Sequence, residues 1–239
     1  PRSLSKDPTL LSVKEVDAKL SRLRSRSAAR DQRMRDVLSV RQGDISKVFP
    51  SMFSEDYPKP LVANFIDVAA RDLAEAMAPL PSFNCSATNM VSDAARKMAD
   101  TRTRIANFYV SNSDLQLQMY TAADWYNTYG MCVGMVEMDY DDNNPRIRML
   151  NPFGVYPELD RYGRTLSLTQ VIVSDAESIA SQYPEYYEQI LGRNNYQLSS
   201  PYVSMVRYHD KDQDLLYIPE RKNLVLSSTP NIIGKCMVR

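Results

Sequence analysis

The stretch of residues 93–163 decides the fold, and it reads DAARKMADTRTRIANFYVSNSDLQLQMYTAADWYNTYGMCVGMVEMDYDDNNPRIRMLNPFGVYPELDRYG. Two helical patterns come first, and they run into strand-like segments at Gly130. The stretch offers no nucleophile with a base, no metal-binding cluster and no phosphate loop. The order of its elements, helices followed by a β-meander, predicts an α+β domain rather than an alternating β/α one.

Two amphipathic helices are predicted in the first half of this stretch. Asp93 is the expected N-cap of the first, which reaches about Val110, and Ser113 or Asp114 caps the second. The short connection between them predicts an antiparallel helical hairpin. The expected apolar faces are Ala94, Met98, Thr101, Ile105 and Phe108 on the first helix, and Leu115, Met119, Ala122, Tyr126 and Tyr129 on the second.

Short strands separated by turns are predicted after Gly130. Ser174-Asp175-Ala176-Glu177 matches a capping box, which predicts one inserted helix reaching about Leu191, with Pro184 as a candidate break. The fold class is therefore α+β, with N-terminal helices followed by a mainly antiparallel β-meander and one inserted helix. The expected strands are residues 131–140, 146–150, 155–159, 165–173, 202–209, 215–218 and 223–227.

Helical patterns also precede the deciding stretch. Residues 9–41 fit two helices or one long irregular helix, and residues 43–60 indicate an ordered loop. Pro60 opens a further helix that Pro79 and Pro81 stop. Its apolar residues recur every three or four positions and form one apolar face: Val62, Phe65, Ile66, Ala69, Leu73, Ala76 and Met77.

The charge distribution divides the chain. Residues 1–48 hold 12 Lys and Arg against 6 Asp and Glu, a net charge of +6, and the remainder holds 17 against 23, a net charge of −6. We therefore expect a basic N-terminal helical arm over residues 1–48, a helical part over 49–129 and a β-rich part over 130–239. The arm's candidate interaction residues are Arg22, Arg24, Arg26, Arg30, Arg33 and Arg35.

Two kinds of partner fit these arginines. Clustered arginines bind DNA phosphates and release counterions, but residues 1–48 contain no aromatic side chain on which single-stranded bases stack. Contact with protein subunits is therefore favoured over contact with DNA, and a solvated arm is the simplest alternative.

Composition limits the classes of function. Hydrophobic residues make up 44% of the chain, enough for a core, and no apolar run approaches the roughly 20 residues that cross a bilayer, so no membrane partner is expected. The three cysteines, Cys85, Cys132 and Cys236, lack metal-ligand spacing and are expected to be reduced thiols. The chain begins without methionine and ends in an apolar run, which favours a piece of a longer polypeptide.

Each group of residues that could bind a metal ion or take part in catalysis has a simpler structural explanation. The acidic segments 139–144 and 210–214 lack the glycine and glutamate positions of an EF-hand and fit solvated turns. His209, the single histidine, has no activated serine or cysteine motif to serve and is interpreted as structural or exposed. No P-loop or GxGxxG pattern occurs among the seven glycines. We assign no catalytic, cofactor-binding or metal-ligating residue.

Several segments taken together resemble the portal (head-to-tail connector) proteins of tailed bacteriophages, in particular the long, divergent portals of siphoviruses. The likeness spans roughly residues 61–239 as an order of elements with scattered identities. Its segments are LVANFIDVAARDLAEAM at 61–77, RIANF at 104–108, DWYNTYG at 124–130, GMCVG at 130–134, IRMLNPFGVYP at 147–157, DRYG at 160–163 and NIIG at 231–234.

The resemblance implies the wing region of a portal, with stem, clip and crown expected beyond residue 239. A portal is a ring of identical subunits, typically a dodecamer, at one vertex of the capsid in the virion, and it is assembled in the host cytoplasm. The implied partners are other copies of the chain, the major capsid protein, the terminase large subunit, a head-tail adaptor or neck protein, and the double-stranded DNA in the channel. The terminase hydrolyses ATP, so the resemblance implies a structural, non-enzymatic chain without cofactors.

Two alternatives are kept, and only the second belongs to a different class of protein. One is another phage head or adaptor structural protein, which shares the need for assembly surfaces. The other is a metal-dependent nuclease that uses the acidic turns as its metal site.

Overall fold

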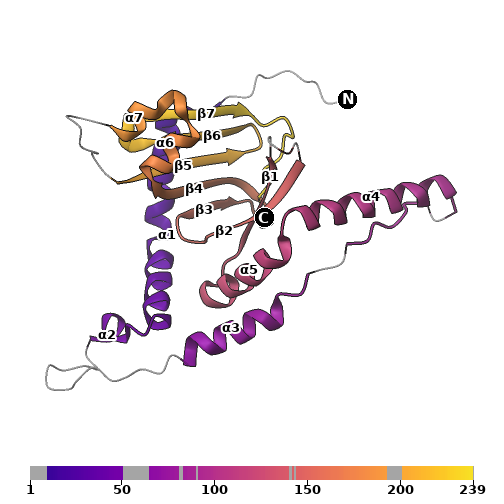
Figure 1. The fold of residues 1–239 in the computed structure, drawn as a ribbon, viewed down its shortest axis with the longest axis horizontal. Helices are drawn as coiled ribbons and strands as arrows, with labels where there is room; N and C mark the ends of the chain where they lie inside the picture. The colour runs from indigo at the N-terminus through magenta and orange to yellow at the C-terminus, as the bar shows by residue number, and fades with distance from the viewer. Residues whose placement is uncertain are drawn as a thin grey trace. The chain divides into compact units, whose positions relative to one another are not determined.

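The chain is an α+β protein in which helices precede antiparallel sheets, and a short helical insertion interrupts the strands (Figure 1). Its fold is that of a computed structural model, which describes residues 10–50, 65–80, 83–89, 91–139, 142, 144–192 and 201–238. The expected helix start at Pro60, the apolar residue Val62 and the stop at Pro81 lie outside these residues.

The described residues form two compact units. Unit 1 is drawn from Pro1–Ala29 and Gly154–Arg239, and unit 2 from Arg30–Phe153. The long helix α1 (Val13–Arg41) is continuous and contributes its first part to unit 1 and its second part to unit 2. The divisions expected from composition differ from these units, because the first strand pair belongs to unit 2 and the first part of the basic arm to unit 1.

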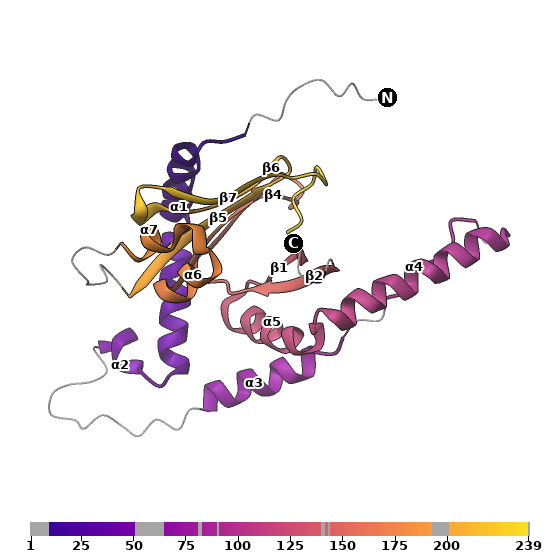
Figure 2. The same cartoon turned by 45° about the horizontal axis from the view of Figure 1, so that its top comes forward.

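Unit 1 is built on a five-stranded antiparallel sheet with its strands in chain order. Side chains alternate along each strand, so one face carries Val206 and Tyr208 while the other carries Val203 and Met205. In Figures 1 and 2 the first part of α1 crosses one face, and the helical insertion lies on the other. The strands are β3 (Val155–Leu159), β4 (Thr165–Asp175), β5 (Tyr202–Asp210), β6 (Gln213–Ile218) and β7 (Leu224–Pro230).

The first part of α1 is held on this sheet by apolar and polar contacts. Val16, Leu20 and Leu23 are buried against the sheet, where they join one hydrophobic cluster with Tyr208 and Tyr217. Burial of such side chains supplies most of the docking energy, at roughly 1.5–3 kcal/mol each.

Two polar contacts fix the register of α1 on the sheet. Lys19 Nζ lies 2.7 Å from Glu158 and donates to the hydroxyls of Ser167 and Tyr208, each at 3.0 Å. Tyr217 donates its hydroxyl to Asp17 at 2.5 Å. Burial raises the pKa of Tyr217 far above its usual range, and the bond to Asp17 adds to the shift.

The helical insertion comprises α6 (Ala176–Gln182), the 3-10 turn η2 (Pro184–Tyr186) and α7 (Tyr187–Leu191). The expected break at Pro184 is confirmed. The N-cap is Asp175, one residue later than the capping box predicts, because its carboxylate accepts from Ser178 N at 2.8 Å. A second 3-10 turn, η3 (Pro219–Arg221), joins β6 to β7.

Unit 2 combines helices with a two-stranded antiparallel sheet. Strands β1 (Val133–Asp139) and β2 (Asn144–Leu150) pair from Val133 opposite Leu150 to Asp139 opposite Asn144. The helices are the second part of α1, α2 (Ile45–Val48), α3 (Phe65–Met77), α4 (Asp93–Asn112) and α5 (Leu115–Tyr129). The N-cap of α4 is Ser92 instead of the predicted Asp93, since its hydroxyl accepts from Ala95 N.

The predicted antiparallel hairpin of α4 and α5 is wrong. The two helices meet at a corner where Asp114 adopts a left-handed conformation, and α4 extends away from α5 (Figures 1 and 2). Helix α5 packs chiefly on α3, and both helices of the corner contact β2. The corner therefore rests on the strand pair, and α4 is left without the helical neighbour that the short connection predicts.

Candidate interaction surface

The most unexpected feature of unit 2 is the outward-facing apolar side of α3. Every described residue of the predicted apolar face is exposed, including Phe65 (77%), Ile66 (56%) and Leu73 (52%). The covered residues are Ala74, which is buried, with Asp67 and Ala70, which are half-buried. The prediction of an amphipathic helix is confirmed, and its apolar face is exposed within this chain.

Helix α4 also exposes its predicted apolar face. The predicted face of Ala94, Met98, Thr101, Ile105 and Phe108 is exposed along its whole length. The covered side consists largely of small residues, chiefly Ala95, Ala99, Thr103 and Ala106, and the chain that precedes α4 lies against it. Cys85 N, for example, donates to Thr103 Oγ1 at 2.9 Å.

Small residues explain why these helices turn their large side chains outward. Alanines let a helix approach its neighbour closely, whereas the larger side chains require a deeper cavity than α5 or the preceding chain supplies. Two helices that expose large apolar side chains at helical spacing make a surface of the kind that marks protein–protein contact. We call these the α3 stripe (Phe65, Ile66, Ala69, Leu73, Ala76 and Met77) and the α4 stripe (Ala94, Met98, Thr101, Ile105 and Phe108).

The α3 stripe is positioned by Arg41, at the end of α1. Its guanidinium bonds Asp67 of α3 from Nε at 2.9 Å and from Nη2 at 2.6 Å, and its Nη1 bonds Asp124 and Thr128 of α5. Burial lowers the pKa of Arg41, but the bonds to Asp124 and Asp67 outweigh burial and raise it. Only 12% of the Arg41 side chain is exposed, so this cation joins three helices and is not available to a ligand.

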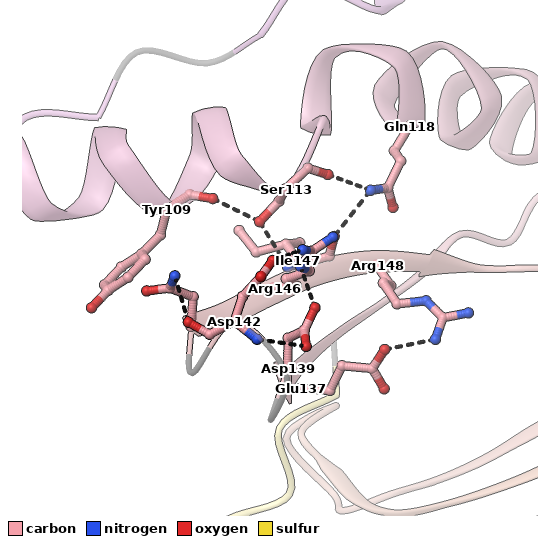
Figure 3. A network of polar contacts seen from close by, with 10 residues as sticks. Tyr109, Ser113, Gln118, Glu137, Asp139, Asp142, Arg146, Ile147 and Arg148 are labelled. Atoms are coloured by element: carbon pink, nitrogen blue, oxygen red, sulfur yellow. Dashed lines mark hydrogen bonds and ion pairs between the residues drawn. The ribbon is translucent and has the colours of Figure 1, made fainter. Parts of the chain in front are cut away.

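The base of the α4 stripe is fixed by the network in Figure 3. Gln118 takes the place of a neighbouring strand beside β2. Its Nε2 donates to Ile147 O at 3.1 Å (Figure 3). Its Oε1 accepts from Met149 N at 2.8 Å. Ser113 Oγ accepts from Ile147 N at 3.0 Å and donates to Tyr109 O at 2.6 Å. These bonds satisfy the outer backbone groups of β2 and hold the end of α4 in place.

The described carboxylates of the first acidic turn are paired with arginine. Arg146 Nε lies 2.7 Å from Asp139 and also pairs with Asp142, while Arg148 pairs with Glu137 at 2.7 Å (Figure 3). Carboxylates that are paired with a guanidinium are poor cation ligands. Across the residues that the structure describes, no three His, Cys, Asp or Glu side chains lie close enough to hold a metal ion.

His209 and the second acidic turn are tied into unit 1. His209 is buried, its Nε2 accepts from Met237 N at 3.3 Å, and its Nδ1 lies 3.5 Å from Asp214 Oδ2. Arg207 Nη2 donates to the same Asp214 oxygen at 2.7 Å. Asp210 accepts from the backbone of Asp212 and Gln213 in an ordinary turn, so these residues have structural partners.

The six arginines proposed as an interaction cluster are distributed over two units. Arg22, Arg24 and Arg26 belong to unit 1, where Arg22 lies 3.5 Å from Glu158 and is 63% exposed. Arg30, Arg33 and Arg35 belong to unit 2. Arg30 and Arg33 line one depression of about 290 Å³ together with Met34, Val37, Thr128 and Tyr129.

Two basic residues with extensive contacts, Lys19 and Arg41, were not among the predicted six. Each pairs with carboxylates that are distant in sequence, so charge density along the chain gives no signal for them.

Comparison with protein-family models finds no match, and comparison with curated proteins finds no significant match. Among the helices of the described residues, none is both long enough and apolar enough to cross a membrane.

Proposed function

We propose that this chain is a structural subunit that acts by assembling with copies of itself. The observation that carries the proposal is the exposure of the α3 and α4 stripes, whose large apolar side chains are uncovered in the single chain. Exposed apolar surface of this kind is costly in water unless a partner covers it. Rigid positioning by Arg41 and by the Gln118 network suits an assembly surface, because a fixed surface loses little entropy on association.

The particular assembly we propose is the portal ring of a tailed bacteriophage, with this chain as its wing region. The order of elements, helices followed by antiparallel strands with one helical insertion, agrees with that role. The portal-like segments contribute to the features that build the surface, since 61–77 includes the α3 stripe and 147–157 includes the β2 groups that Gln118 contacts. Identical copies meeting through two different faces close a ring when the rotation allows it.

In this role the ring forms the channel for DNA packaging and ejection at one capsid vertex. Its partners are the major capsid protein, the terminase large subunit, a head-tail adaptor or neck protein, and double-stranded DNA. The exposed arginines of α1, with Arg22 and Arg26 as examples, are candidates for contact with a neighbouring subunit, capsid protein or DNA. The chain itself supplies shape and surfaces, and chemistry is supplied by the terminase.

Electron microscopy of the purified chain tests the proposal directly. Rings with a central hole are expected, and binding of the ring to the terminase large subunit of the same virus separates a portal from an adaptor protein. Monodisperse single chains at high concentration overturn the proposal. Stoichiometric, tight binding of Mg²⁺ or Mn²⁺ in a calorimetric titration favours a nuclease instead.

A further inference from the structure

The α3 and α4 stripes carry charges of opposite sign. Helix α3 has three acidic residues and one arginine, and no ion pair with a described residue is formed by its exposed Asp72 and Glu75. Helix α4 has four basic and two acidic residues, and its exposed Lys97, Arg102 and Arg104 form no ion pair with a described residue. Among the described residues, therefore, carboxylates without an ion pair border the α3 stripe and cations without an ion pair border the α4 stripe.

The positions of these charges suit a helix-to-helix contact. Successive residues of a helix are rotated by about 100° around its axis. On this basis Asp72 lies beside Phe65 at the border of the α3 stripe, and Glu75 lies on the same side, farther from the stripe. Lys97 and Arg104 follow one border of the α4 stripe, and Arg102 lies beyond the other. Charges that border an apolar seam set the choice and orientation of the partner helix, as in coiled coils.

The two stripes also match in length. At a rise of about 1.5 Å per residue, the α3 stripe from Phe65 to Met77 extends roughly 18 Å and the α4 stripe from Ala94 to Phe108 roughly 21 Å. These lengths correspond to about three helical turns for the α3 stripe and about four for the α4 stripe, so one stripe covers most of the other.

We infer that the α3 stripe of one copy docks on the α4 stripe of the next copy, head to tail. A contact between two α3 stripes places carboxylates against carboxylates, and a contact between two α4 stripes places cations against cations, both of which are unfavourable. The α3-to-α4 contact pairs opposite charges and covers both stripes. Because the two surfaces differ, each copy keeps one stripe free for a further copy, which generates a ring or a filament.

This inference rests on the proposed self-assembly and specifies the surfaces that produce it. It is tested with the full chain and two blocking variants, Leu73→Asp on α3 and Ile105→Asp on α4. Each places a carboxylate in the apolar seam, where burial without a partner is strongly unfavourable. Leu166→Asp in β4 is the matched control, since Leu166 is 54% exposed against 52% for Leu73.

Sedimentation velocity gives the readout. Each blocking variant alone is expected to assemble at least about tenfold more weakly than the wild type, the effect of a single energetically important contact residue. An equimolar mixture is expected to form heterodimers, because the Leu73→Asp chain keeps its α4 stripe and the Ile105→Asp chain keeps its α3 stripe. A far-UV circular dichroism spectrum like that of the wild type and a cooperative unfolding transition show that both variants fold.

Charge reversal provides an independent test. The chain with Asp72→Lys and Glu75→Lys is expected to assemble poorly, and so is the chain with Lys97→Glu and Arg104→Glu. The chain that carries all four substitutions is expected to regain assembly, since opposite charges face each other again.

The failures are distinguishable. A wild-type chain that stays monomeric overturns the proposed function. A wild-type chain that assembles while Leu73→Asp assembles equally well overturns only the α3-to-α4 contact. A mixture of the two blocking variants that forms no heterodimer, or a fourfold reversal without recovery, also overturns the head-to-tail arrangement.

Discussion

Arg41 holds the carboxylate of Asp124 through two hydrogen bonds from the same nitrogen, Nη1, at 2.9 and 3.0 Å. The remaining guanidinium nitrogens bond Asp67, so a single side chain joins the end of α1 to α3 and α5. The orientation of the α3 stripe depends on this junction. A planar guanidinium suits the role because its donors are fixed relative to one another.

Replacing Arg41 by alanine is expected to destabilise unit 2 by on the order of 2 kcal/mol. The substitution removes hydrogen bonds between charged groups and leaves the Asp124 carboxylate without its guanidinium partner. Arg41→Lys retains the charge without the paired geometry and is expected to recover only part of the loss. Urea denaturation followed by circular dichroism measures both. Arg26→Ala, at an exposed position of the same helix, serves as the control, and an equal loss for Arg26→Ala contradicts the prediction.

Gln118→Glu is expected to destabilise the corner of α4 and α5 by about 1–2 kcal/mol, because the amide donor to Ser113 O and Ile147 O becomes a carboxylate that faces two carbonyl groups. Hydrogen exchange of the Met149 amide is expected to accelerate as its acceptor shifts. The exposed Gln116 of the same helix offers a matched change, Gln116→Glu, which leaves that exchange rate unaltered. An unchanged exchange rate of the Met149 amide in Gln118→Glu contradicts the role given to the Gln118 hydrogen bonds.

Leu20→Ala is expected to destabilise unit 1 by about 2–5 kcal/mol, the usual range when a buried leucine leaves a cavity. Leu20 is 5% exposed in the cluster between α1 and the sheet. Ser21→Ala, on the exposed side of the helix, is the control and is expected to be nearly neutral. The melting temperature reports both, and a neutral Leu20→Ala shows that the first part of α1 is not docked on the sheet in solution.

Asp214 makes the stability of unit 1 depend on pH in the acidic range. Burial raises the pKa of Asp214, but its interactions with His209 and Arg207 outweigh burial and lower the pKa from 3.8 to about 2. Because the pKa of Asp214 is lower in the folded state than in the unfolded state, the ionised carboxylate stabilises the fold at pH values above 3.8. This contribution to the free energy of unfolding, about 2 kcal/mol, is lost as the pH falls toward 2. Wild type is therefore expected to lose more stability than Asp214→Asn between pH 4 and pH 2. Parallel pH dependence in the two proteins contradicts the assignment.

Sequence patterns predicted much of the fold because they record local properties. Strands and turns follow from alternation and from turn residues, and the break at Pro184 follows from the missing backbone donor of proline. Cap positions at Ser92 and Asp175 differ from the prediction by one residue, because neighbouring Ser and Asp side chains compete for the same role.

The rest depends on contacts between distant residues. Periodicity shows that Leu73 and Ile105 lie on apolar helix faces, but it does not show what covers them, and in both helices the small side chains pack inside the chain. The arginines from Arg22 to Arg35 were selected only because they are dense along the sequence. Arg41 joins three helices because it pairs with Asp67 and Asp124, which are distant from it in sequence. Likewise, nothing in the sequence around Gln118 indicates that its amide replaces a strand beside β2.

We propose that this chain acts through its shape, repeated around an axis. The most direct test is the particle mass of the purified chain over a wide range of concentrations. The account predicts closed particles whose mass is a fixed multiple of 27.3 kDa, about 328 kDa for twelve copies of 27.3 kDa. Particles of 27.3 kDa at every concentration contradict it.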